Sequence, residues 1–287
     1  MQEFNAPGAN PLSKYFRQPK LYINLPSKGK FYKPGAIDMP ETGEVAVYPM
    51  TAKDELIMKT PDALLNGQAT VDVIKSCVPS IKDPWSMPSI DLDAALIAIR
   101  IATYGEKMDI NAKVPKVGTE KTFQADLNDI LGDLAMANYD TTFRSGDLIM
   151  NIRPLSYREF SQSSIKTFEE QRVFALLNNN DITDEEKLQK FNESFQKLTT
   201  LTMATLTKGI VSIEIDGELV TNAVHINEFI ENSEKSFFND VLSHIEAQRN
   251  KFQVKPFVAQ SEPEEIEAGA PETYEIPIAF DNSTFFA

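Results

Sequence analysis

Proline is the residue that most constrains how the first fifty positions of this 287-residue chain can fold. Proline fixes φ at about −65° and lacks a backbone N–H, so it interrupts helices and central strands. Seven prolines divide the segment: Pro7, Pro11, Pro19, Pro26, Pro34, Pro40 and Pro49. Short apolar pieces lie between them at Leu21 to Ile23 and at Val45 to Tyr48, the second preceded by a turn at Glu41 to Glu44. Residues 1–50 are therefore predicted to form an extended N-terminal arm with short strands.

The charge balance limits the partners that the chain can bind. There are 42 Asp and Glu residues against 28 Lys and Arg, which gives a formal net charge of −14. A general nucleic-acid binder needs a basic face to displace counterions from phosphates, and docking on an anionic membrane also needs positive charge. We therefore expect neither nucleic acid nor a membrane surface as a partner. Hydrophobic residues make up 42% of the chain, which allows a sizeable core.

Cysteine and histidine are scarce, with only Cys77, His225 and His244. One cysteine cannot form an internal disulfide, and these three residues have no known zinc-site spacing. The N-terminus has no apolar stretch of signal-peptide length. The most apolar window, Ala94 to Ala102, contains Arg100 and is far shorter than the roughly 20 residues of a membrane-spanning helix. We therefore expect a cytoplasmic address and none of the commonest enzyme designs.

Helix signals begin at residue 51. Thr51 is a candidate N-cap, and Asp54 and Glu55 follow in the first turn, where the helix dipole favours negative charge. Three further helices are predicted: from Thr60-Pro61 to a stop at Gly67, from Ala69 to Cys77, and from Asp91 to Tyr104 with Gly105 as the stop. Residues 106–153 are predicted to form β structure with loops.

The second half of the chain carries two capping boxes, Ser156 to Glu159 and Thr183 to Glu186. They predict helices at about 157–178 and 184–208. The second helix has an apolar stripe that predicts core packing: Leu188, Phe191, Phe195, Leu198 and Met203. Gly209 to Val220 reads as a hairpin with its turn at Asp216-Gly217. A helical stretch follows from Asn227 to about Arg249, broken near Ser233.

The C-terminal segment changes character after Pro256. Residues 261–275 hold six glutamates and no basic residue, which predicts a solvated linker. An apolar segment follows and includes Phe285 and Phe286, which we expect to dock on the body or on a partner. The predicted fold class is α+β, with two small mixed units of helices, short strands and hairpins, an N-terminal arm and an acidic C-terminal tail. The predicted divisions are 1–50, 51–153, 154–255 and 256–287.

Motifs that could carry chemistry are incomplete. Lys28-Gly29-Lys30 with Lys33 could grip a phosphate or an acidic partner, but P-loop spacing is absent, which favours a solvated loop or protein contact. Ser163 to Lys166 matches S-x-x-K without its companion motifs, which favours an ordinary helix face. Asn178 to Asp181 lacks the Gly and Glu of a calcium loop and reads as a polar turn.

The remaining candidates are more typical of packing than of catalysis. Cys77 is interpreted as a small buried thiol, Trp85 as a packing anchor, and both histidines as packed or surface residues. No catalytic, cofactor or metal-binding residue is predicted. The candidates for partner binding are Lys28, Lys30, Phe31, Tyr32, Phe285 and Phe286.

Several strings together resemble one known family. They are LPSKGKFY from Leu25, YPMTAKDEL from Tyr48 with TPDALLNG from Thr60, and the helix from Asp91 that contains IAIRIATYGE. They look like the baseplate hub subunits, also called hub assembly proteins, of T-even-like contractile-tailed bacteriophages. The resemblance covers most of residues 20–130, and the IPIAFDNSTFF ending from Ile276 is similar too. Residues 154–250 match only in pattern.

One departure from the family bears on metal binding. Many members carry a C-P-x-C pair just after the YGE string, whereas this chain has Lys113-Val114-Pro115-Lys116-Val117-Gly118. The resemblance thus implies a degenerate zinc knuckle at 113–118. Without thiolates, the turn must be held by burial of Val114 and Val117. We expect no zinc, and stoichiometric zinc in the purified protein would contradict this.

The resemblance implies a non-enzymatic structural component of the tail baseplate, near its central hub, that acts by protein–protein assembly without a cofactor. Its expected partners are other hub, wedge or tail-tube proteins. Whether a baseplate contains several copies of this chain is left open. Its expected location is the virion, and the host cytoplasm during assembly. The alternative is an assembly chaperone that leaves before the virion is mature. A third alternative is a peptidoglycan hydrolase, whose active site needs a Glu–Asp pair in a cleft. Acidic residues are plentiful in this chain, but the sequence cannot identify which of them would form the pair.

Overall fold

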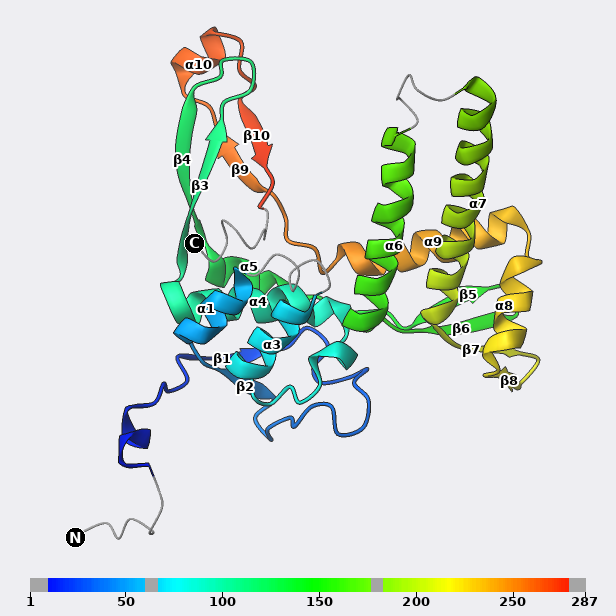
Figure 1. Cartoon of the computed structure of the whole chain (residues 1–287), viewed down its shortest axis with the longest axis horizontal. Coiled ribbons are helices and arrows are strands. Elements are labelled where there is room, and N and C mark those ends of the chain that lie inside the picture. The colour runs from blue at the N-terminus through cyan, green and yellow to red at the C-terminus, as the bar shows by residue number, and fades with distance from the viewer. Residues whose placement is uncertain (1–9, 60–66, 177–182, 279–287) are drawn as a thin grey trace.

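The computed structural model describes residues 10–59, 67–176 and 183–278. Their side chains form three hydrophobic clusters, each built from helices or small antiparallel sheets (Figure 1). The predicted α+β class is confirmed. Residues 60–66 of the helix predicted from Thr60 and the turn predicted at 178–181 lie outside the described residues, as do Phe285 and Phe286.

The first cluster lies around a buried helix, α4 (Leu92–Tyr104). Residues Ala94 to Ile99 are all buried, because the small alanines let neighbouring elements approach from several sides. Gly105 ends the helix at φ 97°, as the sequence predicts. The elements around α4 are β1 (Leu21–Asn24), β2 (Glu44–Val47), α1 (Ala52–Met58), α3 (Gln68–Cys77), the 3₁₀ turns η2 (Pro84–Ser86) and η3 (Ser89–Asp91), and α5 (Leu127–Met136).

Two sequence predictions change in this body. The predicted short strands form as β1 and β2, which pair antiparallel. Leu25, just after β1, and Val45 and Val47 on β2 are fully buried, so residues 21–47 pack in the body and do not extend from it as an arm. Helix α5 lies where only strands and loops were predicted. Its signal was present, because Asp126 caps the helix by accepting a hydrogen bond from the Asn128 N–H, and buried leucines recur at helical spacing.

The second cluster joins a four-stranded antiparallel sheet to three helices, and a fourth helix, which begins at Tyr157, packs against one of these three. The strands are β5 (Thr142–Ser145), β6 (Leu148–Ile152), β7 (Ile210–Ile215) and β8 (Glu218–Val220), and the helices are α6 (Tyr157–Leu176), α7 (Asp184–Lys208), α8 (Ala223–Glu231) and α9 (Lys235–Asn250). The hairpin turn at Asp216 and Gly217 has positive φ at both residues, as predicted. Both capping boxes form, and the helical stretch breaks between Glu231 and Lys235.

The third cluster corrects the prediction of a solvated acidic linker. The segment forms β9 (Phe257–Gln260), the short helix α10 (Pro263–Glu267) and β10 (Thr273–Ile276). The two strands pair with each other and pack on the long hairpin of β3 (Lys107–Lys113) and β4 (Glu120–Asp126) (Figure 1). Acidity did not prevent order, because apolar residues alternate with the glutamates: Tyr274 and Ile276 are buried while Glu275 points to solvent.

The predicted packing of the 113–118 turn is confirmed. Val114 is 1% exposed and lies in the third cluster with Ala259 and Tyr274, and the partly buried Val117 packs against it. The turn closes with a hydrogen bond from the Gly118 N–H to the Val114 carbonyl at 2.8 Å. Apolar contacts with the C-terminal strands therefore hold this turn.

Candidate interaction surfaces

An N-terminal arm projects from the first body (Figure 1). Its 3₁₀ helix η1 (Pro11–Tyr15) begins at Asn10, whose side chain accepts a hydrogen bond from the Leu12 N–H. The proline at the first helical position fits the start of a helix, since its missing N–H would have no partner there. The arm exposes three large apolar side chains, Leu12, Tyr15 and Phe16.

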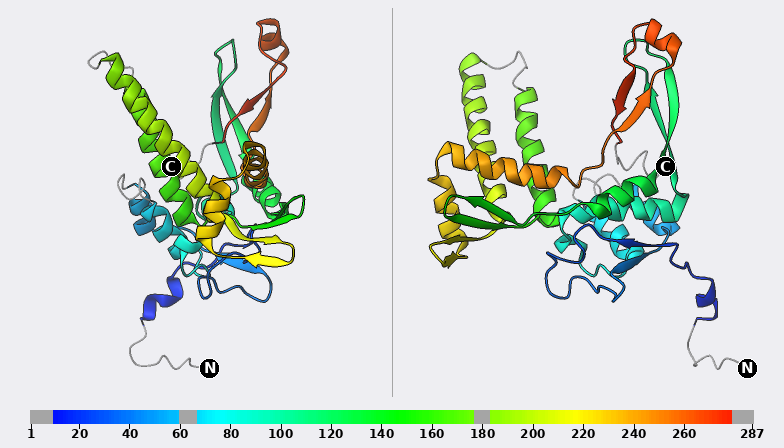
Figure 2. Two further views of the ribbon diagram at one scale, coloured as in Figure 1. Left: turned by 90° about the vertical axis from the view of Figure 1, so that its right-hand side faces the viewer. Right: turned by 180° about the vertical axis from the view of Figure 1, so that it is seen from behind.

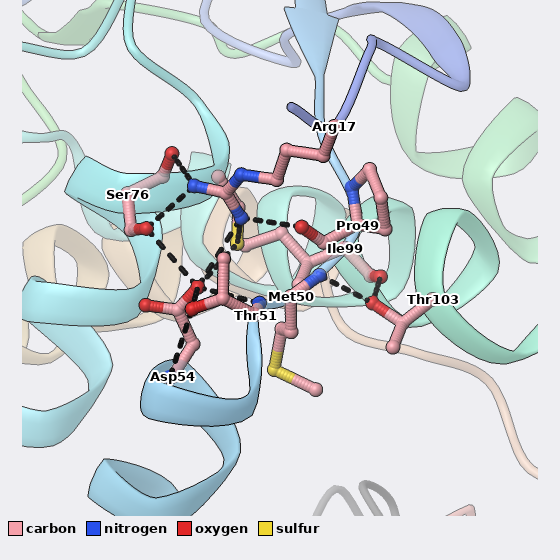
Figure 3. A network of polar contacts seen from close by, with 9 residues as sticks. Arg17, Pro49, Met50, Thr51, Asp54, Ser76, Ile99 and Thr103 are labelled. Atoms are coloured by element: carbon pink, nitrogen blue, oxygen red, sulfur yellow. Dashed lines mark hydrogen bonds and ion pairs between the residues drawn. The ribbon is translucent and has the colours of Figure 1, made fainter. Parts of the chain in front are cut away.

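Arg17 fastens this arm to the body (Figure 3). Its Nη2 donates to the Ser76 carbonyl oxygen and to Ser76 Oγ, each at 2.7 Å. Its Nη1 donates to the Pro49 carbonyl oxygen and lies 3.2 Å from Asp54 Oδ2. The planar guanidinium suits this fork of acceptors, which come from a loop and two helices.

Asp54 is the centre of the same network. Its carboxylate accepts hydrogen bonds from the Thr51 N–H and Oγ1, both at 2.8 Å, and from Ser76 Oγ at 3.1 Å. The predicted N-cap at Thr51 is therefore part of the socket that holds the arm. Cys77 lies beside it, and burial, with Asp54 nearby, raises the pKa of its thiol to about 11. The thiol stays protonated at neutral pH and is a poor nucleophile.

The loop after β1 holds four predicted partner-binding residues. Lys28 and Lys30 are exposed, with Lys28 and Phe31 at positive φ. The two aromatic residues make internal contacts: the Phe31 ring packs edge-on against Tyr139 at 5.7 Å, and the Tyr32 hydroxyl donates to Asp91 Oδ2 at 3.0 Å. Only the two lysines of this group present their side chains fully to solvent.

Asp91 fixes the shape of this loop from inside. Its fully buried carboxylate accepts hydrogen bonds from the Ser27 N–H at 2.7 Å and from Ser27 Oγ at 2.5 Å, as well as from Tyr32. Burial raises the pKa of Asp91 to about 6, although these hydrogen bonds act in the opposite direction. Three donors on one carboxylate make this a structural site that positions the lysine loop.

Helices α6 and α7 form a long hairpin that projects from the second body (Figures 1 and 2). The prediction that the α7 stripe packs in the core is wrong for its first half. Leu188, Phe191 and Phe195 are 63%, 44% and 59% exposed, and Phe168 on α6 is 59% exposed. Towards the base of the hairpin α7 does enter the core, where the predicted Met203 packs against the second cluster and Leu206 is buried in it. The projecting part therefore exposes a large apolar surface to solvent.

A cavity of about 440 Å³ lies between α6, α7 and α9. Its apolar lining includes Phe160, Leu201 and Ile245, and hydroxyl groups come from Ser164 and Thr202. Arg153 lies at its edge and is held by two hydrogen bonds of 2.9 Å to the Glu159 carboxylate. Glu246 and Arg249 of α9 also line the cavity. Because the lining is nevertheless largely apolar, this cavity is more typical of a docking groove than of an active site.

The other residues predicted to have structural roles make packing contacts. Trp85 stacks on Tyr157 at 5.4 Å, which confirms it as a packing anchor. Ser163 is buried and its Oγ accepts a hydrogen bond from Thr205 Oγ1 at 3.1 Å, so it joins α6 to α7. His244 packs against Phe143, while His225 is exposed.

Neither a metal cluster nor a membrane helix is found in the described part of the chain. Within residues 10–59, 67–176 and 183–278, no three His, Cys, Asp or Glu side chains are grouped so that they could hold a metal ion. In the same ranges, no helix is long and apolar enough to span a bilayer.

A projecting arm, an exposed helical hairpin and an apolar groove are together typical of proteins that work through contacts with other proteins. A family model described as T4 bacteriophage base plate protein matches residues 18–258. The chain belongs to this family, which implies a location in the virion tail and contacts with other baseplate proteins. Searches of curated proteins and of solved structures find no match.

Proposed function

We propose that this protein is a non-enzymatic component of the central hub region of the phage baseplate and acts by protein–protein assembly. The observation that carries the proposal is the large apolar surface on the arm and the α6–α7 hairpin. Side chains such as Phe16, Phe168 and Phe195 are costly to leave in water, and contacts with neighbouring subunits would bury them. Family membership supports the setting in which those neighbours occur.

The proposal predicts that the protein is retained in finished particles. Mass spectrometry of purified virions should detect it at a fixed ratio to the other tail proteins, and cryo-electron microscopy of the tail tip should place it at the central hub. Density at the outer edge of the baseplate alone would contradict the hub assignment. A zymogram on cell-wall substrate should show no activity.

The alternative is an assembly chaperone that leaves before the virion is mature. The groove between α6, α7 and α9 favours this alternative, because a chaperone could hold an apolar segment of a tail protein there until assembly. The same measurement separates the two. A protein that is abundant in infected cells and absent from purified virions would contradict the structural proposal and support the chaperone.

A further inference from the structure

The N-terminal arm differs in charge from the rest of this acidic chain. Residues 10–20 contain Lys14, Arg17 and Lys20 and no Asp or Glu, whereas the whole chain has a net charge of −14. On the arm, Leu12, Tyr15 and Phe16 are 62%, 75% and 58% exposed, and Lys14 lies over the Tyr15 ring at 5.0 Å. None of these apolar side chains belongs to a hydrophobic cluster of the described residues. The arm therefore presents apolar and basic groups to whatever it contacts.

A surface of the opposite charge lies on residues 257–276, which comprise β9, α10 and β10 and are named the distal unit here. This unit contains six glutamates and no basic residue. Lys121 pairs with Glu262 and Glu265 at 2.9 and 2.8 Å. The other four, Glu264, Glu267, Glu272 and Glu275, are exposed and belong to no ion pair among the described residues.

The distal unit also offers apolar contacts between its glutamates. Val258 on β9 is 60% exposed and stands opposite Glu275 on β10, and Ile266 on α10 is 38% exposed between Pro263 and Glu267. The distal unit therefore presents apolar side chains among carboxylates. This surface is complementary to the arm, which carries aromatic side chains among lysines. Apolar burial would supply affinity in such a contact, and the charges would supply orientation and specificity.

The positions of the two surfaces decide whether the contact is internal. The arm extends from the end of the molecule opposite α10 in every view (Figures 1 and 2). Arg17 fixes the base of the arm to Ser76 and Asp54 in the first body. The arm of one molecule therefore cannot reach its own distal unit but can reach that of a neighbour.

From these observations we propose that the arm of one copy of this chain docks on the distal unit of a second copy. The contact joins two different surfaces, so it is heterologous and builds a ring or an open head-to-tail chain. The family match covers neither residues 10–17 nor residues 259–276, so family membership does not imply this contact. The proposal stands independently of whether the protein is a hub subunit or a chaperone.

Sedimentation velocity of the full chain over a concentration series tests the proposal. At about 50 mM salt the wild-type protein should associate as its concentration rises. At about 500 mM salt the charges are screened, so the apparent dissociation constant should increase at least tenfold. Two variants, K14E/K20E on the arm and E264K/E267K on the distal unit, should each remain monomeric alone. All four side chains are exposed, and circular dichroism will check that both variants fold.

The decisive measurement mixes the two variants. The acidic arm of K14E/K20E should dock on the basic distal unit of E264K/E267K, so the mixture should associate again although neither variant does alone. The matched control, K166E/K235E, changes two exposed lysines elsewhere and should associate like the wild type. A monomeric wild type at low salt, unchanged association of either single-surface variant, or a mixture that stays monomeric would each overturn the proposal.

Discussion

Replacing Arg17 by alanine removes the anchor of the N-terminal arm, and its cost can be worked from the contacts. The guanidinium makes two 2.7 Å hydrogen bonds to Ser76, one bond to the Pro49 carbonyl, and an ion pair with the nearly buried Asp54. A net hydrogen bond contributes about 1 kcal/mol, and breaking a buried ion pair costs about 3–5 kcal/mol when its partner charge is left alone.

Asp54 is not left alone, and this lowers the expected cost. Its carboxylate keeps three donors after the change, two from Thr51 and one from Ser76. The Arg17 side chain is also 24% exposed, so water weakens part of its contribution. We therefore expect Arg17→Ala to lower the free energy of unfolding by about 2–3 kcal/mol.

This cost can be measured by urea unfolding of the wild type, Arg17→Ala and Arg17→Lys. Unchanged m-values would show that only the free energy of unfolding has changed. Arg17→Lys should lose more than half of the same energy, because an ammonium cannot reproduce the fork to Ser76 and Pro49. Lys14→Ala, on the exposed arm, is the matched control and should stay within about 0.5 kcal/mol of the wild type. A cost below about 1 kcal/mol for Arg17→Ala, or full stability in Arg17→Lys, would refute the reasoning.

Three further predictions concern buried groups. Burial raises the pKa of Asp91 from 3.8 to about 6, so the protonated carboxyl stabilises the fold below pH 3.8 and this contribution is lost as the pH rises through about 6. Relative to Asp91→Asn, which cannot titrate there, the wild type should lose about 2 kcal/mol between pH 4 and 7 in urea titrations, and a constant difference would contradict this. Val114→Ala should destabilise the third cluster by about 2 kcal/mol, whereas Val258→Ala on the exposed face of β9 should change stability by less than about 0.5 kcal/mol. Equal effects of the two changes in thermal unfolding would argue against the packed turn. Leu206→Ala should cost about 2–5 kcal/mol and Leu188→Ser less than about 0.5 kcal/mol, so a large loss in Leu188→Ser would show that the upper part of α7 is packed after all.

Local signals in the sequence were sufficient wherever the structure depends on neighbouring residues. The capping box at Thr51, the stop at Gly105 and the hairpin turn at Asp216-Gly217 all form as predicted. Each is closed by hydrogen bonds or backbone angles within a few residues, so tertiary contacts had little to change. Helix α5 was not predicted, although the cap residue Asp126 and the spacing of the buried leucines indicate a helix. The reason is that the β prediction for the preceding residues was extended through this segment.

The candidate surfaces were predicted less well, since exposure depends on which elements meet. The spacing of Leu188, Phe191 and Phe195 indicates an apolar helix face, but it cannot say whether another element covers that face. The same limit applies to the contacts of Phe31 and Tyr32 with Tyr139 and Asp91, which the sequence pattern does not indicate, and partner binding by these two residues stays a prediction. No local pattern indicates that Arg17 anchors the arm, because its acceptors lie 32 to 59 positions away along the chain.

The sequence alone determined the α+β class, most of the element boundaries and the acidic character, because these follow from periodicity, capping and composition. Only the tertiary structure decided that residues 257–276 form an ordered unit on the β3–β4 hairpin, and that this unit supplies the contacts that bury Val114. It also decided that the basic arm and this acidic unit lie at opposite ends of the molecule. The physical reason is that burial and distance arise from contacts between segments far apart in the chain, which no local pattern encodes.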